Sequence, residues 1–151
     1  MTMKSVLAAA FVLAASPSLA AIELQPGEWQ TTEIGTEDGK PMPPEVEKEC
    51  MNATEARDAT NLAKEMRDQM QGDGAQCQTF DVKQSGETVN FVMKCGDPKQ
   101  FFVDMTGTFT LISPTRYTGA MKTAVTIGGQ TTTSDTKIEA VRVGACKGEK
   151  K

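Results

Sequence analysis

The sequence predicts a mainly β protein (α+β): a curved antiparallel sheet or partly closed barrel, with one helix packed on it and two disulfides. Three observations predict this class. The second half of the chain, Gln76 to Cys146, is rich in Thr, Val, Phe and Ile and is interrupted only at turn residues. One stretch, from Asn52 to Gly74, has the periodicity of a helix. Four cysteines follow an N-terminal segment that has the features of an export signal.

The first 20 residues are expected to form a cleavable signal peptide. Lys4 supplies the positive start, Val6–Ala15 the apolar stretch, and Ala20 ends a small-x-small pattern, so cleavage is predicted after Ala20. The apolar stretch is about half the length of a membrane helix, which favours a signal over the alternative, a retained anchor. We therefore expect residues 21–151 to be a single domain, periplasmic or secreted, with no membrane span in the mature form.

The charge of the chain argues against a nucleic-acid partner. The formal net charge is −4, and loss of Lys4 with the signal makes it −5. The basic residues are scattered, apart from a cluster of lysines at the C-terminus that is expected to be a solvated tail.

The first part of the predicted domain contains one strand and a long connection. Glu28–Ile34 follows a Pro-Gly turn and alternates as a strand does. The segment from Gly35 to Glu49 is rich in Pro, Glu and Lys, so we expect a surface loop, with a lid over a site as the alternative.

A single helix is expected next. Asn52 can cap it, and Glu55 can close a capping box. One face carries small and flexible apolar residues at spacings of three and four: Ala56, Ala59, Ala63, Met66 and Met70. Gly72-Asp73-Gly74 ends the pattern. A face of this kind packs closely and buries little area, so the helix is expected to lie against a sheet.

The cysteines predict two disulfides. Cys77 and Cys95 each lie nine residues from Gly86, so a hairpin turning at Gly86 places them directly opposite each other. The predicted bonds are Cys77–Cys95 and, from the remaining pair, Cys50–Cys146. A Cys₄ zinc site is disfavoured because the spacing matches no zinc motif and because the chain is expected to be exported.

Three longer strands complete the predicted sheet, with Gly128-Gly129 turning the chain into the last one, Gln130–Val143. Gly107 and Gly119 interrupt the apolar faces of the first two, which indicates strongly curved strands. The apolar pattern of the last strand changes phase near Ala140, which predicts a bulge there. The apolar faces of the first two strands consist of Phe101, Val103, Met105, Phe109 and Leu111, and of Tyr117, Met121, Val125 and Ile127.

The residue types exclude several kinds of chemistry. The chain has no histidine, so a Ser-His-Asp triad and His-ligated metals are excluded. It has no C-x-x-C, phosphate-binding glycine loop or nucleophile elbow. Met66 and Met70 share a helix face that could hold Cu(I), but methionine at this spacing more often fills a core. We expect no catalytic residues, no cofactor and no metal site.

Several short motifs resemble one known family. The sequence is similar to small exported Gram-negative proteins catalogued as a domain of unknown function, number thirty-six seventeen, over residues 22–147. Glu28 departs from the hydrophobic residue more common there. The resemblance implies a location and an architecture, and it carries over no catalytic residues. The motifs are Pro26-Gly27-Glu28-Trp29, Cys50-Met51-Asn52, Tyr117-x-Gly119 and Arg142-Val143-Gly144-Ala145-Cys146.

The sequence thus favours a non-catalytic binding or interaction module of the cell envelope, holding a small apolar ligand or presenting a face to an envelope protein. The alternative is a periplasmic enzyme that uses carboxylates or a Ser/Thr–Lys pair. A stability or assembly factor without a ligand is equally compatible with these residues.

Overall fold

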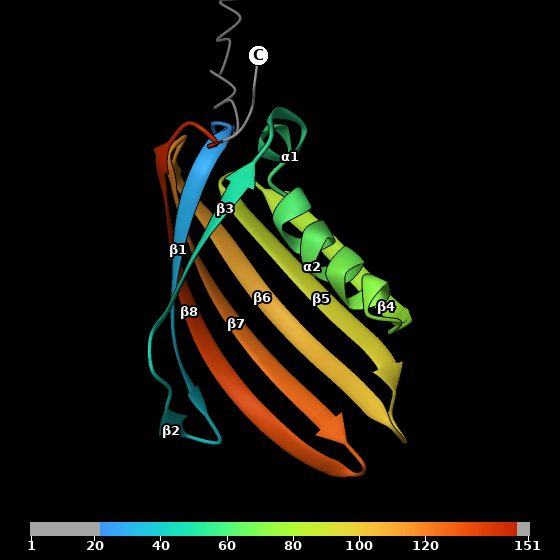
Figure 1. Ribbon diagram of the computed structural model, residues 1–151. Helices are drawn as coiled ribbons and strands as arrows, with labels where there is room; N and C mark the ends of the chain where they lie inside the picture. Colours follow the sequence, from blue (N-terminus) through green and yellow to red (C-terminus); the bar gives the residue numbers. More distant parts are fainter. Residues whose placement is uncertain (1–21, 148–151) are drawn as a thin grey trace, which may run out of the picture.

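The computed structural model describes residues 22–147, which form one large antiparallel sheet with two helices on its concave face (Figure 1). The predicted cleavage site after Ala20 lies outside the described residues. The elements are β1 (Gly27–Glu37), β2 (Lys40–Pro41), β3 (Glu45–Met51), α1 (Ala53–Arg57), α2 (Asn61–Gly72), β4 (Cys77–Ser85), β5 (Thr88–Asp97), β6 (Phe101–Ser113), β7 (Arg116–Ile127) and β8 (Gln130–Gly144).

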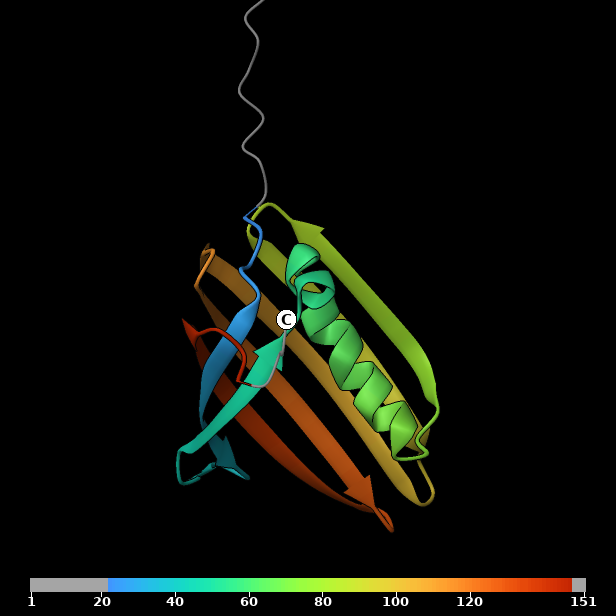
Figure 2. The ribbon, with the colours of Figure 1, turned by 45° about the horizontal axis from the view of Figure 1, so that its top comes forward.

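The sheet is a meander to which the N-terminal strands are added. Strands β4 to β8 follow one another in space, β1 lies beside β8, and both β2 and β3 pair with β1, all antiparallel. The sheet is not closed, because β3 and β4 end it on opposite sides (Figure 1). Figure 2 shows α2 inside the curve, next to β4 and β5. No helix between residues 22 and 147 is long and apolar enough to cross a membrane.

The predicted curvature is confirmed, and two glycines have a second role in it. Gly107 faces Phe91 across the β5–β6 pair, and a Cβ at Gly107 would lie 2.4 Å from the Phe91 ring. Gly119 faces Phe109 in the same way, at 2.9 Å. The two rings stack with their centroids 5.5 Å apart. The glycines therefore leave room for aromatic rings to lie directly on the backbone.

A dry core forms at one end of the sheet, where the helices and the segment before β1 cover it. The sheet side of this core includes Trp29, Val89 and Leu111, none of which is exposed to solvent. The covering side consists of Leu24, Met51, Ala56, Ala59, Leu62 and Ala63. The alanines let the helices approach the sheet closely, as the sequence pattern indicates.

The single predicted helix is wrong, because the chain breaks after Arg57 and forms two helices. The capping box of Asn52 and Glu55 starts α1 as expected. Asp58 then leaves the helical conformation, and its carboxylate accepts hydrogen bonds from the Thr60 backbone N–H (2.9 Å) and hydroxyl (2.6 Å). A short polar side chain that bonds to the local backbone in this way competes with the helix.

The expected loop from Gly35 to Glu49 is wrong in part. The segment is exposed, but its second half becomes strand β3, which pairs with β1 from Gly27↔Met51 to Glu33↔Glu45. Four of the seven residues of the strand are charged, and it lacks the apolar alternation that marks a strand in a sequence. Backbone pairing with β1 holds it in place of side-chain burial.

The bulge predicted near Ala140 is displaced along the strand. Pairing is continuous at Ala140, with Thr31↔Ala140 followed by Gln30↔Val141. The irregularity lies further along β8. Glu28 and Trp29 are consecutive in β1, but they pair with Gly144 and Arg142, so that β8 has one extra residue between them. Ala140 and Val141 differ in phase because Ala140 faces the core while Val141 lies on the convex face, 39% exposed.

Candidate functional site

Both predicted disulfides are present and belong to the scaffold. Cys77 and Cys95 face each other in the β4–β5 hairpin, with Cα atoms 3.8 Å apart. Cys50 of β3 bonds to Cys146, just after β8, with a Cα separation of 5.4 Å. The second bond ties the edge strand β3 to the end of the sheet.

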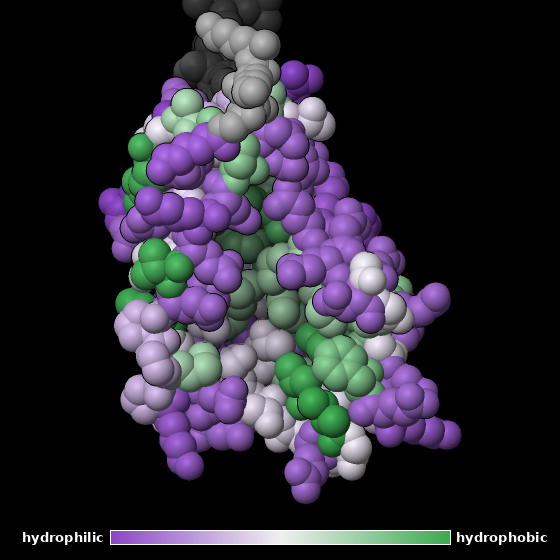
Figure 3. All heavy atoms as spheres, in the orientation of Figure 1, coloured by the Kyte–Doolittle hydropathy of each residue, from purple (hydrophilic) through white to green (hydrophobic). Residues whose placement is uncertain are grey.

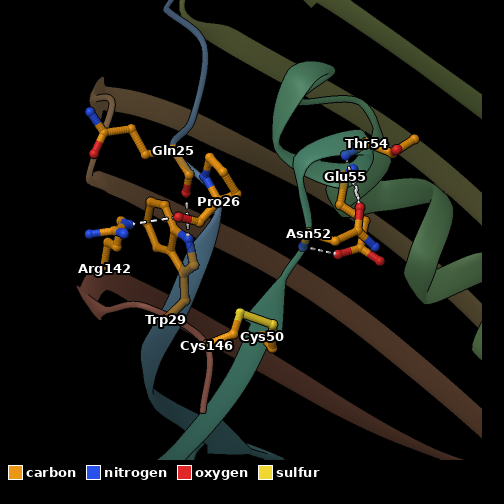
Figure 4. The surroundings of a disulfide bond; sticks show 9 residues. All are labelled: Gln25, Pro26, Trp29, Cys50, Asn52, Thr54, Glu55, Arg142 and Cys146. Carbon is orange, nitrogen blue, oxygen red and sulfur yellow. Dashed lines mark hydrogen bonds between the residues drawn. A yellow bond between two sulfur atoms is a disulfide. The ribbon is translucent and has the colours of Figure 1, made fainter. Parts of the chain in front are cut away.

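Hydrogen bonds reinforce the end of the sheet around Cys50–Cys146 (Figure 4). The Trp29 indole N–H donates to the Gln25 carbonyl (3.0 Å), and Arg142 Nε donates to the Pro26 carbonyl (2.8 Å). Both bonds hold the segment before β1 against the sheet. The disulfide and these hydrogen bonds therefore hold β1 and β3 in place, and with them the side chains that point to the concave face.

Beyond the dry core, the concave face of the sheet is hollow. A cavity of about 840 Å³ lies against β1 and β5–β8, and its lining is mainly apolar. The residues facing it include Phe91 and Met121, but also two glycines, Gly35 and Gly107, and the small Thr136. The main contacts of α2 with the sheet are on β4 and β5, and none of the residues that line this cavity comes from a helix. Figure 3 shows the hollow in the centre of this face, with weakly hydrophobic atoms inside and hydrophilic ones around it.

A second, smaller space lies between β3, β1 and α2. Its volume is about 280 Å³, and Met121 lines both it and the larger cavity. Its floor is apolar and aromatic, formed by Phe109, Tyr117, Met121 and Ile138. We call this space the acidic end of the hollow, because Glu33, Glu47, Glu49 and Glu65 also line it.

The four carboxylates come from three elements. Glu47 and Glu49 face Thr31 and Trp29 across the β1–β3 pair, so they point to the concave side, as does Glu33 of β1. Glu65 approaches from α2. None of the four forms an ion pair with a lysine or arginine within the described part of the chain, where six other ion pairs occur.

Burial, and then the charges of neighbouring acidic groups, raises the pKa values of three of these carboxylates, Glu33, Glu49 and Glu65. Desolvation by the walls of the hollow, followed by the charges of Glu55, Glu49 and Asp68, raises the pKa of Glu65 to about 7. Desolvation is also the largest cause of the raised pKa values of Glu33 and Glu49, with neighbouring glutamates next. Glu49 and Glu65 are nevertheless exposed to solvent, so the acidic end is an open cleft and not a closed cavity.

Tyr117 forms the polar point of the floor. Its side chain is 4% exposed, and its ring lies 5.4 Å from that of Trp29 and 5.9 Å, edge-on, from that of Phe109. Burial, and then the charge of Glu49, raises the pKa of Tyr117 far above its ordinary value, so the hydroxyl stays neutral. Beside it, Thr31 Oγ1 is buried and has no hydrogen-bond partner of good geometry within residues 22–147.

Comparison with known proteins identifies the family. The family described as protein of unknown function (DUF3617) matches residues 24–146. The chain belongs to this family. No curated protein and no solved structure matches the chain. The family assignment agrees with the resemblance seen in the sequence, and it assigns no role to any residue.

In this DUF3617 chain, the carboxylates of the hollow were missed by sequence reasoning. A single glutamate carries no signal, and β3 was expected to be a loop. The one available signal was the alternation of Glu45, Glu47 and Glu49, which would share a face in a strand. Met66, for which filling the core was favoured over a copper site, is partly buried and packs against the core. In residues 22–147, no three acidic or cysteine side chains are placed to hold a metal ion.

Proposed function

We propose that this protein is a non-catalytic binding module of the cell envelope, and that it holds a small apolar or amphipathic ligand in the hollow of its sheet. The observation that carries the proposal is the cavity of about 840 Å³ with a mainly apolar lining. Ligand sites commonly have volumes of roughly 300–1,000 Å³ and combine apolar walls with a few polar groups.

The framework around the hollow supports a preformed site. Long hydrogen-bonded strands form its floor, and the disulfides Cys77–Cys95 and Cys50–Cys146 brace the sheet. A site that is already shaped before the ligand arrives loses less entropy on binding. The same disulfides, with the expected signal peptide, support a periplasmic or secreted location.

Binding of the uncharged dye Nile red tests this proposal. Thr136 lies on the floor of the cavity, opposite Gly35 and Met121, so Thr136→Trp should fill the space and abolish the fluorescence increase on dye binding. Thr118→Trp places the same ring on the convex face and should leave binding unchanged. Equal binding by both variants and the wild type would contradict the proposal.

Native mass spectrometry adds a direct measurement. Protein released from the periplasm should retain a co-purifying small molecule, and the Thr136→Trp protein should lack it. A wild-type protein that is empty and that binds no apolar probe would count against a ligand carrier.

A carboxylate-based enzyme is the second candidate. One observation favours it: the pKa of Glu65 is raised to about 7, which suits a general acid or base, and the buried Tyr117 lines the same space. For an enzyme, turnover of the bound molecule should follow the ionisation of one group near pH 7 and be lost in Glu65→Gln. A binding module returns its ligand chemically unchanged at every pH.

A further inference from the structure

We infer that the hollow is built for an amphipathic cation, with an apolar chain on the floor of the large cavity and an amine or quaternary ammonium group at the acidic end. The inference rests on the proposed binding function and adds the chemical class of the ligand.

The two spaces adjoin at Met121, which lines both of them. An extended ligand that lies along Phe91 and Met121 would therefore reach towards Tyr117 and Phe109. One part of this path is mainly apolar, and the other is bordered by four carboxylates. The charged residues that are also among the lining residues of the mainly apolar part are Lys122, Asp135 and Lys137. A ligand that matches both parts has one apolar and one charged region.

The charge of the four carboxylates is not compensated by the elements that carry them, β1, β3 and α2. The basic residues on these three elements have other partners: Lys48 lies 4.0 Å from Glu28, and Lys64 lies 3.0 Å from Asp58. Arg67 bonds to Asp68 and lies over the ring of Phe80, on the other side of α2. A ligand cation is thus the group that would offset the repulsion among the four glutamates.

Two hydroxyl-bearing residues, Thr31 and Tyr117, line the acidic end independently of the carboxylates. Thr31 Oγ1 is buried without a hydrogen-bond partner of good geometry within residues 22–147, and Tyr117 beside it is also buried. An N–H of a ligand amine can donate a hydrogen bond to the Thr31 oxygen, whereas a quaternary ammonium group has no N–H and is favoured here by its charge and by the aromatic floor.

The arrangement also indicates the size of the cation. Metal ions need oxygens that converge on one point, and in the described residues no three acidic side chains do so. The carboxylates instead surround an aromatic and apolar floor. A bulky organic cation matches this arrangement, because it can lie over the aromatic rings of the floor while the carboxylates surround it.

Isothermal titration calorimetry with three ligands of equal chain length tests the inference: decyltrimethylammonium, decanol and decanoate. We expect the cation to bind at least about tenfold more tightly than decanol, and decanoate to bind more weakly than decanol. Added sodium chloride should weaken binding of the cation and leave decanol binding nearly unchanged.

Two triple variants with the same change in net charge provide the control. Replacing Glu47, Glu49 and Glu65 by Gln should remove the preference for the cation and retain decanol binding. Replacing Glu23, Glu87 and Glu139, which lie outside the hollow, by Gln should retain the preference. Circular dichroism checks folding, and the salt dependence of the wild-type protein gives the same answer without any variant.

The outcomes separate the two proposals. If the three ligands bind the wild-type protein equally, or if both triple variants behave alike, the hollow binds apolar molecules and the cation inference is wrong. If decanol and the cation both fail to bind, the proposed binding function is wrong as well.

Discussion

The two ends of the sheet are made by the same strands and yet differ in what lies on their concave face. At the end near Cys50–Cys146, large side chains such as Trp29 and Leu111 are covered by the helices and by the segment before β1. Further along the same strands, the inward positions include Gly35, Gly107 and Thr136, and no helix covers them. The first end is a dry core and the second an open hollow.

This difference separates stability from binding. The dry core buries apolar area and supplies the favourable free energy of folding, whereas the hollow leaves apolar surface available to a ligand. Changes in the dry core should therefore lower stability and leave the shape of the hollow intact. Truncation of side chains that line the hollow should have small effects on stability and large effects on binding.

The largest expected effect comes from the disulfide at the dry end. Cys50→Ser with Cys146→Ser opens a loop with a sequence separation of 96 and should lower the free energy of unfolding by about 4.7 kcal/mol in the loop-entropy description. Cys77→Ser with Cys95→Ser opens a loop with a separation of 18 and should cost about 3 kcal/mol. Urea unfolding measures both, and a larger loss from the second pair would contradict the ranking.

A matched pair of truncations compares the two ends directly. Leu111 is fully buried, so Leu111→Ala should cost about 3 kcal/mol. Met121 is half-buried on the floor of the hollow, so Met121→Ala should cost about 1 kcal/mol and weaken Nile red binding. Equal losses of stability from the two substitutions would mean that the hollow is packed as tightly as the core.

The glycine under Phe91 gives a smaller and more local effect. A Cβ at Gly107 would lie 2.4 Å from the Phe91 ring, so Gly107→Ala should displace the ring and cost about 2 kcal/mol. Gly72→Ala, at the end of α2, meets nothing within 4 Å and serves as the control. An unchanged melting temperature for Gly107→Ala would show that the ring moves freely.

The smallest effect is a dependence of stability on pH. Because the pKa of Glu65 is raised from 4.5 to about 7 in the folded protein, the folded state binds more protons than the unfolded state between those values. The contribution of Glu65 to stability is therefore complete below about pH 4.5 and is lost as the pH rises through 7. Glu65→Gln should flatten the melting temperature across this range relative to the wild type, and Glu87→Gln should not.

Much of the fold could be predicted from the sequence, because its signals are local. The position of Gly86 midway between two cysteines predicted both the hairpin and Cys77–Cys95, and Gly107 and Gly119 predicted the curvature. Asn52 and Glu55 correctly marked a helix start. In each case, a short stretch of chain contains the physical cause.

The features that were missed depend on residues far apart in the sequence. Strand β3 has no apolar pattern and exists because β1 pairs with it. The acidic end of the hollow needs that strand, Glu33 and Glu65 together, so no single segment indicates it. The position of the hollow depends on which part of the sheet α2 covers. That in turn depends on the break in the helix at Asp58 and on the packing of α2 against β4 and β5.

The central claim is that the hollow binds the ligand, and the methionine methyl groups report on it most directly. Met121 lines both parts of the hollow, while Met51 and Met93 are buried outside it. In a protein labelled with ¹³C at the methionine methyls, titration with decyltrimethylammonium should shift the Met121 signal progressively and leave those of Met51 and Met93 in place. A Met121 signal that does not move at ligand concentrations that saturate the calorimetric titration would contradict the claim.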